Sequence, residues 1–139
     1  MDTDNFEVDF RHLVEPDFPV SVNRLTEIVI GCSYNVSNNL GNGFLEKVYE
    51  NALAIELSKA GLNFVQQHHL DVLYDGQVVG QYCADFLVEN VSVVEIKALS
   101  GLTDSHKAQL INYLKATNNK VGLLINFGKP KVEVKRAVL

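Results

Sequence analysis

Two carboxylates and a lysine lie close together in the middle of the chain. Asp85 is near the end of one apolar segment, residues 82–88, and Glu95 and Lys97 belong to the next, residues 91–98. Residues two apart on a strand share a face, with Cα atoms roughly 6.5–7 Å apart, so Glu95 and Lys97 can address one bound water. With Asp85 added, the pattern predicts a metal site formed by two strands.

Asp85 is surrounded by apolar residues, where an unpaired ionised carboxylate is costly, so it must be paired, protonated or bound to a cation. A salt bridge from Asp85 or Glu95 to Lys97 explains these three residues equally well. A strict two-residue turn at Glu89-Asn90 would pair position 85 with 94 and turn Asp85 away from Glu95. We therefore predict a three-residue turn, with Asn90 in the left-handed conformation, that pairs 85 with 95.

Three more polar residues are candidates on helical segments. Glu46 follows Gly43 in the first turn of a helix, where a carboxylate could equally close a capping box or face the positive end of the helix dipole. Gln109 and Tyr113, four residues apart, project from one side of a later helix. Taken alone, these two fit an ordinary boundary pair.

The elements that must position these residues follow from the spacing of apolar side chains. Intervals of three and four residues predict helices, Asp75-Gly76 predicts a tight hairpin, and continuous apolar runs predict buried strands. The predicted elements are helices over 25–40, 44–61 and 103–117 and strands over 64–74, 77–88, 91–98 and 120–127. Their order, α-α-β-β-β-α-β, predicts an α/β fold (α+β mixed sheet) in which helices flank a central mixed four-stranded sheet.

Length and composition allow one compact domain. The chain has 139 residues, 47% of them hydrophobic, and we expect a single domain over 21–139 after an acidic extended arm over 1–20. No apolar run reaches the roughly 20 residues of a membrane span, and the N-terminus is too acidic and polar for a signal peptide. We therefore expect a cytoplasmic protein with no membrane partner.

The formal net charge of -5 at first argues against a nucleic-acid partner. The arm accounts for all of it, because Arg11 is its only base and it holds six acids: Asp2, Asp4, Glu7, Asp9, Glu15 and Asp17. The remainder is neutral, and a basic face is possible where Lys115, Lys120, Lys129, Lys131, Lys135 and Arg136 gather. Scattered solvated lysines explain the same residues equally well.

The segment Gly43-Phe44-Leu45-Glu46-Lys47-Val48-Tyr49 resembles the motif that names the GxxExxY family of small proteins. The resemblance extends from about Leu25 to Phe127 and includes the Asp85 strand, the Glu95-Ile96-Lys97 strand and the helix with Gln109 and Tyr113. That family is placed in the PD-(D/E)XK nuclease superfamily, and Gln109-x-x-x-Tyr113 also resembles the motif of its RecB-type exonuclease branch. The resemblance implies a restriction-endonuclease-like core.

The resemblance also implies an activity, a metal-dependent nuclease that hydrolyses DNA phosphodiester bonds. Asp85 and Glu95 would bind Mg²⁺ or Mn²⁺, with the carbonyl of Ile96 as a further ligand and Glu46 reaching the ion directly or through water. Hard cations of this kind prefer such oxygen ligands.

The remaining implied roles concern water, substrate and partners. Lys97 would orient the attacking water, and Gln109 and Tyr113 would position the substrate phosphate or support the site. The superfamily often dimerises, so a homodimer is also implied.

Departures from the family pattern concern substrate binding more than metal binding, and the small size and weak positive charge of the chain favour a second hypothesis. A usual Pro is Asn42, a usual Arg is Cys83, and a usual Glu-x-His is Asn35-Val36-Ser37. None of these is a proposed metal ligand, but they remove charge and rigidity near the site. The alternative is therefore a non-catalytic nuclease-fold module that binds nucleic acid or a protein partner.

Overall fold

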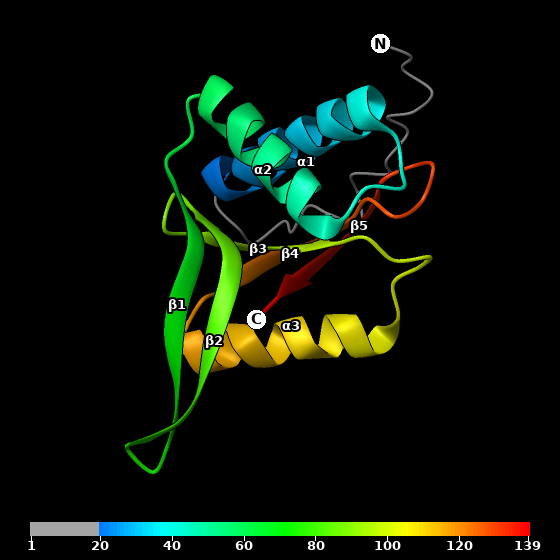
Figure 1. The fold of residues 1–139 in the computed structure, drawn as a ribbon. Helices are drawn as coiled ribbons and strands as arrows, with labels where there is room; N and C mark the ends of the chain where they lie inside the picture. The colour runs from blue at the N-terminus through cyan, green and yellow to red at the C-terminus, as the bar shows by residue number, and fades with distance from the viewer. Residues whose placement is uncertain (1–19) are drawn as a thin grey trace.

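A five-stranded mixed sheet with helices on both faces forms the part of the chain that the computed structural model describes, residues 20–139 (Figure 1). The sheet order is β1-β2-β3-β4-β5, parallel only between β3 and β4. The α/β class predicted from the sequence is confirmed. The elements are α1 (Val20–Leu40), α2 (Glu46–Lys59), β1 (Phe64–Tyr74), β2 (Gln77–Val88), β3 (Ser92–Lys97), α3 (Asp104–Thr117), β4 (Val121–Asn126) and β5 (Glu133–Val138). The predicted acidic arm lies outside the described residues, apart from Val20.

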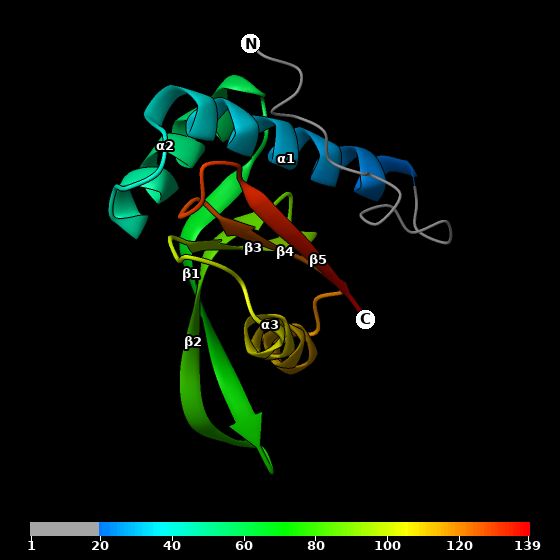
Figure 2. The same cartoon turned by 90° about the vertical axis from the view of Figure 1, so that its right-hand side faces the viewer.

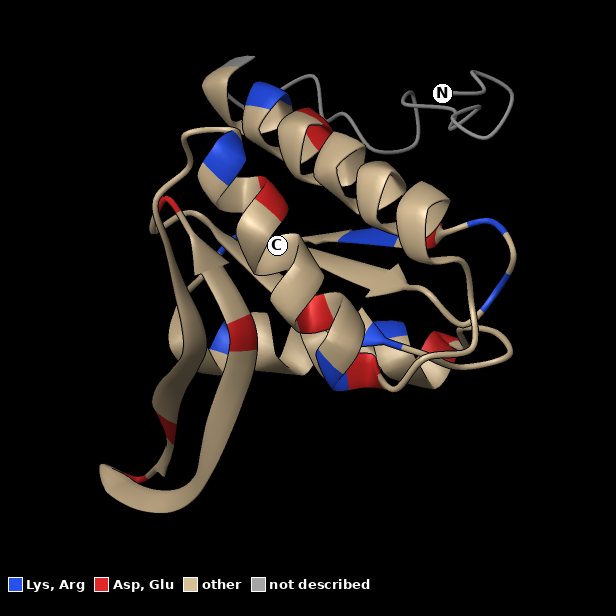
Figure 3. Cartoon of the chain, turned by 45° about the horizontal axis from the view of Figure 1, so that its top comes forward, with Lys and Arg blue, Asp and Glu red and all other residues tan. Residues whose placement is uncertain are grey.

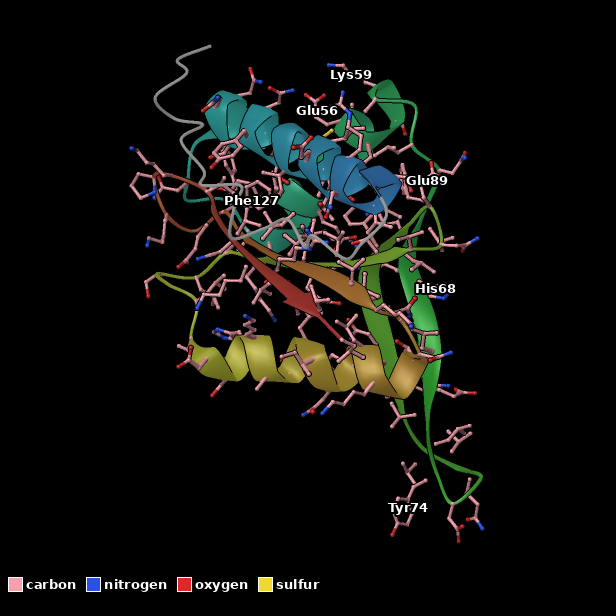
Figure 4. All side chains as sticks on the ribbon, turned by 180° about the vertical axis from the view of Figure 1, so that it is seen from behind. Glu56, Lys59, His68, Tyr74, Glu89 and Phe127 are labelled. Carbon is pink, nitrogen blue, oxygen red and sulfur yellow. The ribbon has the colours of Figure 1, made fainter. Side chains whose placement is uncertain are left out.

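Two hydrophobic cores lie on the two faces of the sheet. Helices α1 and α2 cover one face and α3 covers the other, as the two orthogonal views show (Figures 1 and 2). On the α1–α2 side, Phe127 is buried and its ring lies flat against that of Tyr49, with centroids 4.8 Å apart (Figure 4). On the other side, Leu110 and Leu114 of α3 pack with Leu124 of β4. Burial of both faces explains why β4 reads as a nearly continuous apolar run.

The predicted count of four strands is wrong, because β5 pairs antiparallel with β4 along the edge of the sheet. Its sequence Glu-Val-Lys-Arg-Ala-Val was interpreted as part of a basic cluster, since three charged residues conceal the strand pattern. Arg136 is buried in this strand and donates a hydrogen bond to Asn23 Oδ1 (3.1 Å). Arg136 therefore does not belong to an exposed basic face.

Strands β1 and β2 form a long hairpin whose tip projects beyond α3 (Figure 1). Asp75 and Gly76 both have positive φ, 53° and 74°, as the predicted tight turn requires. Tyr74, the last residue of β1, lies near this tip (Figure 4). None of the helices within residues 20–139 has the length and apolar character needed to cross a bilayer.

Candidate active site

The register between β2 and β3 decides whether Asp85 and Glu95 can meet. The ladder is Phe86↔Val94, Leu87↔Val93 and Val88↔Ser92, which leaves a three-residue turn. This confirms the predicted odd-length turn. Continued by one residue, the same register sets Asp85 opposite Glu95, so both carboxylates belong to one face.

The turn itself is fixed by contacts to Asn63, in the loop between α2 and β1. Glu89 and Asn90 are both left-handed, with φ of 53° and 55°, and Val91 N–H donates to the Val88 carbonyl at 3.0 Å. Glu89 is held to Asn63 twice: its N–H donates to the Asn63 carbonyl (2.8 Å), and its Oε1 accepts from the Asn63 N–H (2.7 Å). The prediction named Asn90 but not Glu89, whose side chain pairs with a residue distant in sequence.

Asp85 and Glu95 are half-buried side by side and each has further hydrogen-bond partners. Asp85 Oδ2 accepts from the Ile96 backbone N–H at 2.7 Å, and Asp85 Oδ1 accepts from Gln67 Nε2 at 3.2 Å. The hydroxyl of Tyr82 donates to Glu95 Oε1. These bonds fix the direction of both carboxylates, which a metal or substrate site requires.

Both carboxylates have raised pKa values, chiefly because burial removes water from them. Desolvation by burial is the main cause that raises the pKa of Glu95, to about 8, and the charge of Asp85 adds to it. Burial also raises the pKa of Asp85, the Ile96 N–H opposes the rise, and the charge of Glu50 adds to it. A divalent cation beside Asp85 and Glu95 would relieve this repulsion, so the donor set fits a hard cation.

Lys97 lies two residues after Glu95, at the end of β3. Its backbone is held by β4, because Phe127 N–H donates to the Lys97 carbonyl at 2.8 Å. Its charge lowers the pKa of both Glu95 and Glu46, so it is near both groups. The salt bridge that the sequence left open is not among the ion pairs of residues 20–139.

Glu46 is the first residue of α2 and faces the same site. Leu45 is the N-cap residue and no side chain caps the helix there, so the capping interpretation is not supported. Glu46 reaches solvent, yet neighbouring protein atoms remove part of its hydration. This desolvation is the main cause that raises its pKa; Lys97 opposes the rise, while Asp85 and Glu50 add to it.

The tyrosine of the Gly-x-x-Glu-x-x-Tyr motif has a structural role. The buried Tyr49 hydroxyl donates to the Gly41 carbonyl at 2.7 Å and accepts from the Phe44 N–H at 3.1 Å. Gly43 has φ of 113°, a conformation that side chains rarely adopt. Tyr49 thus holds the loop that sets the starting point of α2, and with it Glu46.

Gln109 and Tyr113 are connected to the carboxylates through Tyr82, a residue that sequence reasoning missed. The Tyr113 ring stacks on that of Tyr82, with centroids 3.5 Å apart and planes 9° apart. Gln109 Nε2 lies 3.3 Å from the Tyr113 hydroxyl. Because Tyr82 donates to Glu95, the α3 pair is linked to the site by way of β2.

Two other neighbours of the site were also missed, Glu50 and Gln67. The side chain of Glu50 is buried, with 3% of the residue exposed. Its Oε2 accepts a hydrogen bond from Lys47 Nζ at 3.0 Å, and both of its carboxylate oxygens lie 3.0 Å from Gln67 Nε2, which donates. Glu50 lies four residues after Glu46, and this spacing indicates that the two carboxylates share one face of α2. No sequence signal pointed to Gln67, because a polar residue in a half-exposed strand is ordinary.

No group of three or more His, Cys, Asp or Glu side chains in the described residues has the arrangement of a metal centre. Asp85 and Glu95 therefore form a pair of carboxylates rather than a complete metal cage. A backbone carbonyl and water are needed in addition, as is usual for Mg²⁺.

Charges are unevenly spread over the molecule. Lysines and acids alternate along α2 and around the site, whereas the β1–β2 hairpin carries acids but no Lys or Arg (Figure 3). A hollow of about 320 Å³ lies elsewhere, lined largely by apolar residues of α1 and the β2–β3 turn, including Leu25, Ile28 and Val91. None of the candidate site residues lines it.

Comparisons with known proteins identify a superfamily and a similar fold. A family model described as the PD-(D/E)XK nuclease superfamily matches residues 23–137. No curated protein sequence matches significantly. A solved structure entitled "Crystal structure of SSO0001" is similar, with a TM-score of 0.54 and 22% identity over 83% of this chain and 57% of that chain. This chain thus spans little more than half of that protein, and the likeness concerns the fold alone.

Proposed function

Because this chain belongs to the PD-(D/E)XK nuclease superfamily, we propose that it is a metal-dependent nuclease that hydrolyses DNA phosphodiester bonds at Asp85, Glu95 and Lys97. One observation carries the proposal. The β2–β3 register sets Asp85 opposite Glu95, while Lys97 follows on the same strand face as Glu95. The finer assignment to the GxxExxY family rests on the motif from Gly43 to Tyr49 and is part of the proposal.

The metal would be Mg²⁺ or Mn²⁺, held by Asp85, Glu95 and the carbonyl of Ile96, with Glu46 reaching it directly or through water. The raised pKa values of Asp85 and Glu95 support this, because they reflect the cost of holding two half-buried carboxylates ionised without a cation, chiefly through burial. When bound, such an ion offsets the negative charge that grows on the phosphate during hydrolysis.

The protein's own groups prepare the reaction. Lys97 supplies an ammonium group that orients the attacking water and favours loss of its proton. Tyr82 holds Glu95 through a hydrogen bond, and Tyr113 packs on Tyr82. Gln109 is exposed on α3 and Tyr113 is half-buried beside it, and from there the pair would position the substrate phosphate.

A second function is favoured by a specific feature, the tip of the β1–β2 hairpin. Leu73, Tyr74, Val78 and Val79 are exposed there, between 58% and 75%, and the hairpin carries no Lys or Arg. An apolar surface without positive charge suits a protein partner better than a phosphate backbone. The alternative is therefore a non-catalytic nuclease-fold module that binds a protein, for which a homodimer is one form.

A cleavage assay separates the two functions. Wild type and Lys97→Ala are incubated with Mg²⁺ or Mn²⁺ and with single-stranded, duplex and branched DNA and RNA, and Lys59→Ala, an exposed lysine paired with Glu56 (3.3 Å), is the control. We expect wild type and Lys59→Ala to cleave DNA, and Lys97→Ala to cleave at least about 100-fold more slowly. Metal binding without any cleavage, unchanged by Lys97→Ala, would support the non-catalytic module instead.

A further inference from the structure

Gln67 has a backbone conformation that its place in the fold does not explain. Its φ is 56°, in the left-handed region. The other non-glycine residues with positive φ in the described part of the chain lie in turns or at a helix end, whereas Gln67 lies inside strand β1. A left-handed residue inside a strand costs energy, and such strain is concentrated at functional sites.

The irregularity coincides with Asp85 on the neighbouring strand. The ladder pairs Gln66 with Phe86 and His68 with Ala84, so Gln67 is opposite Asp85. Phe86 packs in the α1–α2 core, but Ala84, two residues away, packs in the α3 core. Residues two apart normally share a face, so the hairpin rotates at Gln67 and Asp85.

This backbone directs the Gln67 amide between two carboxylates on different elements. Its Nε2 lies 3.0 Å from both carboxylate oxygens of Glu50 on α2 and 3.2 Å from Oδ1 of Asp85 on β2. Its Oε1 lies 3.1 Å from Sγ of Cys83, which donates. Since ionised carboxylates only accept hydrogen bonds, the NH₂ end must face Glu50 and Asp85.

We propose that Gln67 is a positioning residue: its amide holds Asp85 beside Glu95 and ties it to the buried Glu50, and the strained backbone is kept because it aims that amide. The inference rests on the proposed function, in which Asp85 binds the metal. A neutral donor suits this place, because a lysine would compete with the cation and a carboxylate would add a third negative charge.

The test measures Mn²⁺ affinity by electron paramagnetic resonance, together with thermal unfolding of the metal-free protein. Gln67→Gly keeps the left-handed backbone without strain and removes the whole side chain, and with it the amide contacts to Glu50, Asp85 and Cys83. The matched control is Gln66→Ala, which removes another donor to Glu50 but has no contact with Asp85.

We expect Gln67→Gly to bind Mn²⁺ about 10- to 100-fold more weakly, the range typical of partners that orient metal ligands, while Gln66→Ala stays within about twofold of wild type. Metal-free Gln67→Gly should still unfold cooperatively. Gln67→Asn, which tolerates the left-handed region but has a shorter amide, should also bind more weakly than wild type, and it provides the test if Gln67→Gly does not fold.

Two negative results have different meanings. If wild type binds Mn²⁺ and both Gln67 variants bind it equally well, the positioning role is wrong and the proposed function stands. If wild type binds no Mn²⁺ at all, the proposed metal-dependent function fails, and the positioning role fails with it.

Discussion

Glu95 gives the site a pH dependence whose sign follows from its pKa. The folded-state pKa of about 8 lies above the usual 4.5, chiefly because of burial and then the charge of Asp85. Between these values the folded protein binds more protons than the unfolded chain, so stability falls as pH rises. The unfolding temperature of the metal-free protein should therefore decrease between about pH 5 and pH 8, with the Asp85 shift acting in the same direction.

The check is differential scanning calorimetry at several pH values, with and without Mg²⁺. Saturating Mg²⁺ should raise the unfolding temperature more at the upper end of this window, where both carboxylates are ionised. Glu95→Gln should flatten the dependence. A metal-free protein whose stability rises through this window would show that Glu95 does not control it.

Tyr82 is the second residue whose role can be isolated. Tyr82→Phe removes the hydrogen bond to Glu95 but keeps a ring for Tyr113 to stack on. Because that hydrogen bond lowers the pKa of Glu95, its loss should raise the pKa further and weaken Mg²⁺ binding roughly tenfold.

Isothermal titration calorimetry of Mg²⁺ provides the measurement for Tyr82→Phe. Tyr74→Phe, at the exposed hairpin tip, is the control and should bind like wild type. Equal affinities of Tyr82→Phe and wild type would mean that the hydrogen bond does not orient Glu95.

The sequence revealed the charged residues that lie within apolar strands. It did not reveal the residues whose role depends on backbone conformation and on contacts with distant elements. Asp85 and Glu95 were conspicuous because carboxylates interrupt apolar strands. Gln67 and Tyr82 were not, since neither residue type is unusual on a half-exposed strand. Their importance depends on a local backbone rotation and on a partner from another element, which local sequence patterns do not encode.

At the scale of elements, the β2–β3 turn controls the site. Glu89 combines a left-handed backbone with a side-chain bond to the Asn63 N–H. Glu89→Ala should lower the free energy of unfolding by about 0.5–1.5 kcal/mol, because the Asn63 N–H loses this hydrogen-bond partner. Urea denaturation measures it.

Glu27→Ala is the matched control for the turn, since Glu27 forms an exposed ion pair with Arg24 and should change stability by less than about 0.5 kcal/mol. Equal effects of the two substitutions would mean that Asn63 does not fix the turn through Glu89.

The same turn shows what could be predicted about elements. The requirement that Asp85 and Glu95 share a face predicted three residues in the turn, and Asp75-Gly76 predicted the hairpin; both are confirmed. Strand β5 was missed because an edge strand with charged residues lacks the apolar run that revealed β4.

At the scale of the whole molecule, the order of elements was enough to predict helices on both faces of a mixed sheet. What the order did not contain is how far the hairpin extends past α3 (Figure 2) or that Arg136 is buried. Both depend on packing between distant segments. The overall negative charge is likewise a poor guide to substrate, because charges near the site are mixed while the hairpin has no Lys or Arg.

The central claim is that Asp85 and Glu95 hold a divalent metal, and calorimetric titration of Mn²⁺ tests it most directly. Asp71→Asn is the matched control, since Asp71 is an exposed carboxylate on the same hairpin. We predict saturable binding to wild type and Asp71→Asn, and binding at least about tenfold weaker for Asp85→Asn. Absence of binding to wild type, or equal affinity for Asp85→Asn, would contradict the account.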